Sequence, residues 1–259
     1  MPVPRSARQP SLELWLVDLV ADVPLLLDVA HRHGLVEPAT VATVPDRHGG
    51  RVDAARDAAR SALRILLAGY VGLDLARAPF RVARGGKPEL APLPDGHLRP
   101  LFSLAHCDTA AIVALSTDGA VGVDIEAPRP VRLADHRRAM LLDAARSLAP
   151  TDALPEGPAE AQFLQGWVRL EALAKATGEG LGALLGRLDD AVAPIASTRM
   201  EGRSVLVRDV GQDSVPGHFA AIAGTTSSLA ADAPRPLARL LPLDRVWLER
   251  RLSGAPPWL

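Results

Sequence analysis

The order of hydrophobic and polar positions along the chain predicts a mixture of strands and helices. Apolar and polar residues alternate over residues 12–19, which favours a first strand. A helix is expected over 53–68, and the prolines from 88 to 100 indicate a long irregular connection. Two β-rich runs then flank the Asp-Gly step at 118–119, which predicts a hairpin. Later elements are expected as a helix over 158–177, strands over 203–210 and 218–223, and a short helix near the end.

Two pairs of segments recur along the chain at almost the same offset. The segment ALRILLAGYVGL at 62–73 matches LEALAKATGEGL at 170–181, and AAIVA at 110–114 matches AAIAG at 220–224. Alanine and leucine are abundant here, so each match alone is within chance. The shared offset favours two similar α+β halves. We therefore expect an N-terminal half over 1–118, a C-terminal half over 119–224 and a loose tail over 225–259.

The strand expected at VGVDIE, residues 121–126, carries two carboxylates on one face. Alternation puts Asp124 and Glu126 on one side and the apolar residues on the other. A solvated strand face explains an isolated pair of this kind more often than a site does. Two close like charges are also well explained by a divalent cation with oxygen ligands, typically Mg²⁺ bound to phosphate. In the hairpin, Asp124 would lie opposite Ala111, with His106 just beyond the same end.

The helix expected over 158–177 carries a stripe of Trp167, Glu171 and Lys175, four residues apart. A surface Glu–Lys pair is a common reason for such spacing. On a helical wheel, however, Glu171 lies on the apolar side, whereas Gln162, Gln165 and Arg169 mark the outer face. A carboxylate on an apolar side needs a partner, which could be a metal ion, Lys175 or both.

Only two of the 29 basic residues are lysines, Lys87 and Lys175. Lysine is a compact ammonium on a flexible stem that can follow a phosphoryl group and can lose its proton, whereas arginine is a planar fork that stays charged. Lys87 lies in RGGKPEL, whose glycines allow close backbone approach, although Gly-Lys-Pro alone is more often an ordinary turn. Both lysines are therefore candidates for phosphate chemistry.

The bulk composition describes an ordinary globular protein. A net charge of −1 gives no basic field of the kind that nucleic-acid binding needs, so no nucleic-acid partner is expected. The single cysteine, Cys107, cannot form an internal disulfide, which fits a cytoplasmic location. The apolar run over 12–27 is interrupted by acidic residues and lacks a basic flank, so neither a signal peptide nor a membrane span is expected.

Four motifs, GGKPEL, LFSLAHC, VGVDIE and WVRLEALAKATGEGL, resemble in order and spacing those of the surfactin-type 4′-phosphopantetheinyl transferases. The resemblance covers about residues 55–185. It implies an α+β fold that is a pseudo-dimer of two similar halves within one monomer, with coenzyme A and Mg²⁺ in the cleft. It also implies transfer of 4′-phosphopantetheine from coenzyme A to a serine of an acyl or peptidyl carrier protein, with release of 3′,5′-bisphosphoadenosine.

Carried over residue by residue, the resemblance assigns the chemistry to four side chains. Asp124, Glu126 and Glu171 correspond to the metal-binding carboxylates. Glu171 is also the expected base for the carrier serine, directly or through water. Lys175 would contact the phosphate and assist the leaving group.

The resemblance assigns binding of coenzyme A to three further positions. His106 matches a histidine that binds the phosphate of the nucleotide, and Lys87 matches a contact of the Gly-Lys-Pro motif. Arg60 is a weaker match to a basic position of the first helix. Trp167 is expected to shape the cleft rather than to take part in the chemistry.

The chain departs from the family pattern at several positions. Ser103, Ala105 and Cys107 stand where the family usually has Asn, Ser and Ser, which removes one or two hydroxyl contacts. Leu170 replaces the lysine of Trp-x-x-Lys-Glu, and the neighbouring Arg169 is the charge that could compensate. These changes bear on affinity for coenzyme A. A non-catalytic carrier- or coenzyme A-binding relative and an unrelated Mg²⁺-dependent phosphodiesterase therefore stay open as alternatives.

A basic and apolar segment follows the carboxylate strand at 127–146. A solvated basic helix is at least as good an explanation of it as function. Carrier proteins for this family are usually acidic helical bundles, so a basic edge beside the metal would steer them. The arginines concerned are Arg129, Arg132, Arg137 and Arg138.

Overall fold

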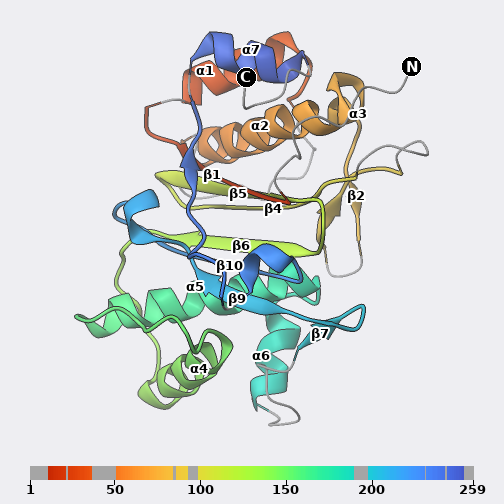
Figure 1. The fold of residues 1–259 in the computed structure, drawn as a ribbon. Helices are drawn as coiled ribbons and strands as arrows, with labels where there is room; N and C mark the ends of the chain where they lie inside the picture. Colours follow the sequence, from red (N-terminus) through yellow and green to blue (C-terminus); the bar gives the residue numbers. More distant parts are fainter. Residues whose placement is uncertain are drawn as a thin grey trace.

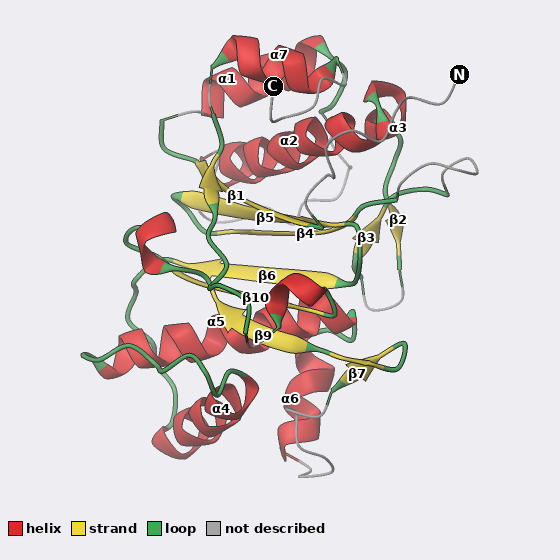
Figure 2. Cartoon of the chain, in the orientation of Figure 1, coloured by secondary structure: helices red, strands yellow, loops and turns green. Residues whose placement is uncertain are grey.

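The computed structural model describes residues 11–21, 23–36, 51–83, 86–92, 99–189, 198–230, 232–242 and 244–253. Its helices and strands form four layers, in the order helices, sheet, sheet, helices (Figure 1, Figure 2). The chain is therefore α+β, as the sequence predicts. Within the described ranges, no helix is both long enough and apolar enough to cross a membrane.

The first sheet has the strand order β11-β1-β5-β4. β5 lies in the middle and pairs antiparallel with both β1 and β4, while β11 pairs parallel with β1. Helices α1, α2 and α7 cover its outer face around an apolar core (Figure 1). The bounds are β1 Leu12–Asp18, α1 Val23–Arg32, α2 Arg51–Val71, β4 Leu101–His106, β5 Ala110–Ser116, β11 Arg239–Leu240 and α7 Arg245–Leu252.

The second sheet has the strand order β6-β10-β9, with both pairs antiparallel. Helix α5 packs along its outer face and α4 packs on α5 (Figure 2). The sequence predicts α5 and β10 to within a residue or two. The bounds are β6 Val121–Glu126, α4 Asp135–Leu148, α5 Ala159–Thr177, α6 Leu181–Asp189, β9 Leu206–Asp209 and β10 Phe219–Gly224.

The two sheets face each other through apolar side chains of their inner strands. Ile112 of β5 and Val123 of β6 belong to one buried cluster between the sheets. Asp124 lies on the opposite face of β6, as the alternation predicts, and the structure directs this face toward α5. The polar side of β6 is therefore directed toward the helix that carries Glu171 and Lys175.

The predicted hairpin between the two β-rich runs is wrong. β5 and β6 belong to different sheets, and Asp124 pairs with Ala221 of β10 rather than with Ala111. Both edges of β5 are already taken, by β1 and β4. The chain therefore leaves the first sheet after Ser116 and begins the second at Val121, where the apolar face of β6 stacks on the first sheet instead of pairing at its edge.

The remaining elements are short, and two of them, β11 and α7, lie near the C-terminus. In the segment predicted as a loose tail, β11 extends the first sheet, and Arg251 of α7 is buried and donates to the carbonyl oxygen of Leu66. This end of the chain therefore packs on the first sheet and α2. The short elements are α3 Leu73–Arg77, β2 Arg81–Val82, β3 Pro88–Glu89, β7 Arg199–Met200, β8 Arg203–Ser204 and the 3₁₀ turns Gln212–Ser214 and Ser227–Leu229.

Candidate active site

A cavity of about 800 Å³ lies between α2 and β4 on one side and the C-terminal part of α5 on the other. Five of the seven predicted site residues line it: Arg60, Lys87, His106, Glu171 and Lys175. The sequence therefore identifies most of the polar lining. The other two, Asp124 and Glu126, are not among the lining residues.

The C-terminal turns of α5 set one wall of the cavity. Glu171 and Lys175 lie one turn apart on the helix and both line the cavity. The helix ends at Gly178, whose φ of 71° is left-handed and whose N–H bonds to the carbonyl oxygen of Ala174. Gly178 also lines the cavity, so the end of the helix opens directly into it.

Asp124 is held by the cation of Lys175. The Lys175 ammonium donates to Asp124 Oδ1 at 2.6 Å, and the aspartate side chain is only 9% exposed. Burial raises the pKa of Asp124 to about 7, although Lys175 lowers it, and the charges of Glu171 and Glu126 raise it further. All three predicted carboxylates are thus close enough to act on one another electrostatically.

Glu126 has a cation of its own. Arg129 donates from Nε and Nη2 to its two carboxylate oxygens at 3.1 and 3.0 Å. Across the described part of the chain, no three His, Cys, Asp or Glu side chains are arranged to hold a metal ion. Two carboxylates of the predicted metal site instead bind basic side chains: Asp124 binds Lys175 and Glu126 binds Arg129. The donor set still fits Mg²⁺ chemically, because it consists of carboxylate oxygens that already attract positive charge.

The opposite wall is cationic and comes from α2. Arg56 and Arg60 lie one turn apart on that helix and line the cavity with His106, which ends β4. Desolvation lowers the pKa of His106, and the positive charges of Lys175, Arg56 and Arg60 lower it further. Such a concentration of positive charge is suited to a polyanion such as a phosphate group.

Sequence reasoning missed Arg56 and the aromatic side of this wall. Arg56, Arg60 and Arg64 are four residues apart on α2, a spacing that could have revealed the stripe. The Arg64 guanidinium lies 4.2 Å from the ring centre of Phe80, and both residues line the cavity. The wall therefore offers a flat, partly apolar surface next to its charges.

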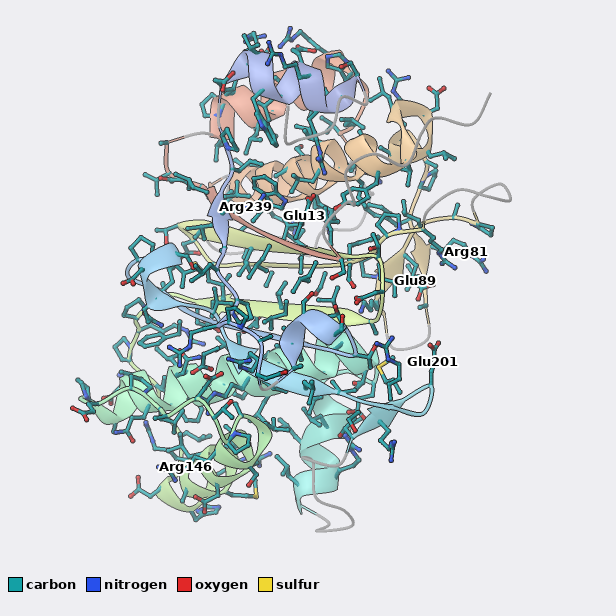
Figure 3. All side chains as sticks on the ribbon, in the orientation of Figure 1. Glu13, Arg81, Glu89, Arg146, Glu201 and Arg239 are labelled. Carbon is teal, nitrogen blue, oxygen red and sulfur yellow. The ribbon has the colours of Figure 1, made fainter. Side chains whose placement is uncertain are left out.

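Lys87 lies between the main cavity and a smaller one of about 190 Å³, and lines both. Its ammonium donates to the carbonyl oxygen of Val121 at 2.8 Å. Burial lowers the pKa of Lys87 to about 8, although Glu89 opposes the shift. Glu89 and Glu201 line the smaller cavity and both lie at the edge of the molecule where β3 and β7 emerge (Figure 3).

Two residues of α5 contradict the helical wheel. Gln165 and Arg169 were expected on the outer face, yet they are 1% and 0% exposed. Arg169 donates to both carboxylate oxygens of Asp209 at 2.7 Å and to the carbonyl oxygen of Asp152. The helix is buried on two sides, because the second sheet covers one face and α4 another. Arg169 therefore cannot supply the charge that Leu170 lacks.

The other departures from the family pattern lie partly outside the cavity. Leu170 is fully buried in the core beneath α5, and Ala105 is buried between the two sheets. Ser103 does line the cavity, where its hydroxyl accepts a hydrogen bond from the Val123 N–H at 3.1 Å. Cys107 contacts the carbonyl oxygen of Ala110 at 3.6 Å. The replacements at Leu170 and Ala105 thus change core packing rather than the cavity lining.

The sequence is similar to known proteins over about half of the chain. No protein-family model matches it. It is 33% identical over 132 residues to a Synechocystis protein that is provisionally assigned as a 4′-phosphopantetheinyl transferase, over 50% of this chain and 51% of the relative. It is 30% identical to the 4′-phosphopantetheinyl transferase HetI of Nostoc over 56% of this chain and 60% of the relative.

A third similarity is to the 4′-phosphopantetheinyl transferase psf-1 of Bacillus pumilus, with 30% identity over 46% of this chain and 48% of the relative. The chain thus matches about half of the length of these curated relatives. All three carry the name of one enzyme class. The chain is therefore similar, in the regions compared, to 4′-phosphopantetheinyl transferases.

Proposed function

We propose that the chain is a surfactin-type 4′-phosphopantetheinyl transferase. It would move 4′-phosphopantetheine from coenzyme A to a serine of an acyl or peptidyl carrier protein and release 3′,5′-bisphosphoadenosine. The observation that carries this proposal is the polarity of the 800 Å³ cavity, whose α2 wall is cationic and whose α5 wall presents Glu171. The similarity to enzymes of this name supports the same reaction.

The proposed metal site consists of Asp124, Glu126 and Glu171. Hard carboxylate oxygens are the ligands that Mg²⁺ prefers, and Lys175 and Arg129 show that two of these groups already hold cations. When bound, Mg²⁺ would supply positive charge for the diphosphate of coenzyme A. Without a bound metal ion, Lys175 and Arg129 neutralise the carboxylates of Asp124 and Glu126.

The reaction joins the serine oxygen of the carrier to the phosphorus that bears pantetheine and breaks its bond to the oxygen of the nucleotide phosphate. Glu171 takes the serine proton, because it lies at the cavity surface. Lys175, one turn away, neutralises the charge that develops on the departing phosphate oxygen. Arg60, His106 and Lys87 hold the nucleotide end against the opposite wall.

We also propose that the two sheets are the two halves of a pseudo-dimer within a cytoplasmic monomer. The repeat AAIVA lies in β5 and AAIAG lies in β10, and each of these strands is in the middle of its sheet. The other repeated segment occurs at the ends of α2 and α5, which cover the two outer faces. The repeated segments thus occupy equivalent places in the two layers.

The position of the replaced residues favours the enzyme over the non-catalytic relative. Leu170 and Ala105 motivate that alternative, yet both are buried in the core, away from the cavity. The groups expected to carry the chemistry, Glu171 and Lys175, are present and line it. A relative that only binds coenzyme A or a carrier would not need both the base Glu171 and the cation Lys175.

One incubation tests the proposal. The protein is mixed with coenzyme A, Mg²⁺ and an apo acyl or apo peptidyl carrier protein, and the carrier is weighed by mass spectrometry. We expect the mass gain of one phosphopantetheine group, lost when the carrier serine is replaced by alanine or when a chelator is added. Cleavage of coenzyme A without a change in the carrier would indicate the phosphodiesterase. Binding without either change would indicate the non-catalytic relative.

A further inference from the structure

Gly122 of β6 has no room for a side chain. A Cβ atom built on it would lie 2.8 Å from the carbonyl carbon of Lys175, and closer still to the carbonyl oxygen of Ala172 and the amide nitrogen of Ala176. Ordinary van der Waals contact between carbon atoms needs about 3.5–4.0 Å. Gly122 does not have the positive φ that favours glycine elsewhere in the chain. Space, rather than backbone conformation, therefore requires glycine here.

The atoms that would meet this Cβ belong to the backbone of α5, so no side-chain rotation can relieve the clash. The same turns of α5 carry Glu171 and Lys175. On the strand, Asp124 follows Gly122 by two residues and faces the same helix, and it bonds to Lys175 at 2.6 Å. The distance between strand and helix at Gly122 therefore determines how the carboxylates and the lysine meet.

We propose that Gly122 is a positioning residue, whose missing side chain lets α5 bring Glu171 and Lys175 within reach of Asp124. This inference rests on the proposed function, since it assigns a role in that reaction. Gly69 and Gly119 are also tightly enclosed, but they are enclosed by Arg251 and by Thr225, away from α5. Among these, Gly122 alone adjoins the helix that lines the cavity.

A single methyl group at Gly122 must move the C-terminal turns of α5 away from β6. A displacement of about 1 Å at reacting groups can lower a rate by about 100-fold. The cationic wall is built from α2 and β4 rather than from α5. The effect should therefore fall on kcat rather than on the KM for coenzyme A.

Gly166 provides a matched control on the same helix. A Cβ atom there would lie 3.2 Å from side-chain atoms of Ala145 and Leu142, on the α4 side of α5. The Leu142 side chain can rotate away, and the few tenths of an ångström needed at the Ala145 Cβ require only a small shift of α4. Gly166→Ala should thus test the general effect of a new methyl group on α5 without changing its distance from β6.

The experiment compares Gly122→Ala and Gly166→Ala with the parent chain in steady-state carrier modification. For Gly122→Ala we expect kcat to fall about 100-fold with the KM for coenzyme A within about threefold of the parent value. Mn²⁺ affinity, measured by electron paramagnetic resonance without coenzyme A, should also fall. Gly166→Ala should keep the kcat and the Mn²⁺ affinity of the parent chain. A folded Gly122→Ala chain with the parent kcat would overturn the proposal.

A second variant guards against loss of folding. Ala172→Val adds bulk to α5 at a fully buried position beside the second sheet, and should also lower kcat while the KM for coenzyme A is kept. Failure of both variants to fold by circular dichroism would show that the contact serves stability alone, and would overturn the positioning role. A parent chain that modifies no carrier would instead refute the proposed function itself.

Discussion

The two walls of the cavity differ in charge and in origin. The α2 wall contributes Arg56 and Arg60 from the layer of the first sheet, whereas the α5 wall contributes Glu171, next to Asp124 of the second sheet. The α2 wall is suited to binding a polyanion, and the α5 wall is suited to binding cations and transferring protons. In the proposed reaction, binding and chemistry are therefore separated between the two layers, so substitutions on each wall should change different kinetic constants.

The largest effect is expected on the α5 wall. Glu171→Gln keeps the size of the side chain but removes the base, so kcat should fall about 10²–10⁴-fold. The matched change on the other wall, Arg60→Met, should mainly raise the KM for coenzyme A. Steady-state kinetics of carrier modification measure both. Near-parent turnover in Glu171→Gln would show that the two walls do not divide the work in this way.

The next effect concerns the cation that Asp124 holds. Lys175 bonds to Oδ1 of this carboxylate at 2.6 Å, so it competes with a divalent cation for Asp124. Lys175→Met should therefore bind Mn²⁺ about tenfold more tightly than the parent chain, although it transfers phosphopantetheine poorly. Titration calorimetry or electron paramagnetic resonance measures the affinity without any turnover.

Lys87→Met is the control for this prediction. It removes one positive charge from the same cavity, but its ammonium contacts the carbonyl oxygen of Val121 rather than Asp124. Equal gains in Mn²⁺ affinity for both variants would mean that net charge, rather than the contact with Asp124, governs metal binding. Asp124→Asn should lose Mn²⁺ binding if the carboxylate is a ligand at all.

Lys87 should give the cavity a pH dependence. Burial lowers the pKa of Lys87 to about 8, so its ammonium loses its proton as the pH rises through that value. A phosphate anion favours the charged form, and the KM for coenzyme A should therefore rise by several-fold between about pH 8 and 9. Lys87→Arg stays charged, so its KM should start higher at pH 7 and then stay level. If the KM of the parent chain and that of Lys87→Arg changed with pH in the same way, Lys87 would not be a binding residue for coenzyme A.

Local periodicity explains why much of the fold and site could be predicted from the sequence. The alternation of VGVDIE places Asp124 on the polar face of its strand, and the spacing of Glu171 and Lys175 places both on one side of their helix, where both line the cavity. These relations hold within one element, where a residue's neighbours are fixed by helical or strand geometry. The sequence therefore predicts which face of each element is directed toward the candidate site.

The remaining features depend on partners distant in the sequence. β6 pairs with β10, about a hundred residues later, and nothing in the turn at Asp118 reveals this. Arg169 looks like a surface residue until Asp209, forty positions away, is seen to bond to it. Both errors arise because burial and strand pairing are decided by packing between layers, which local patterns do not record.

The smallest effect is expected outside the cavity, on the segment that follows β6. Arg132 and Arg137 are exposed there, whereas Arg138 bonds to the carbonyl oxygen of Val131 and Arg129 holds Glu126. If an acidic carrier docks on this edge, replacing Arg132 and Arg137 with glutamate should slow its association by several-fold at low salt and by less at physiological salt. The KM for coenzyme A should not change, because neither residue lines the cavity. Carrier kinetics measured at two ionic strengths provide the test. Unchanged kinetics at low salt would place carrier docking elsewhere and leave the contrast between the two cavity walls as the main determinant of activity.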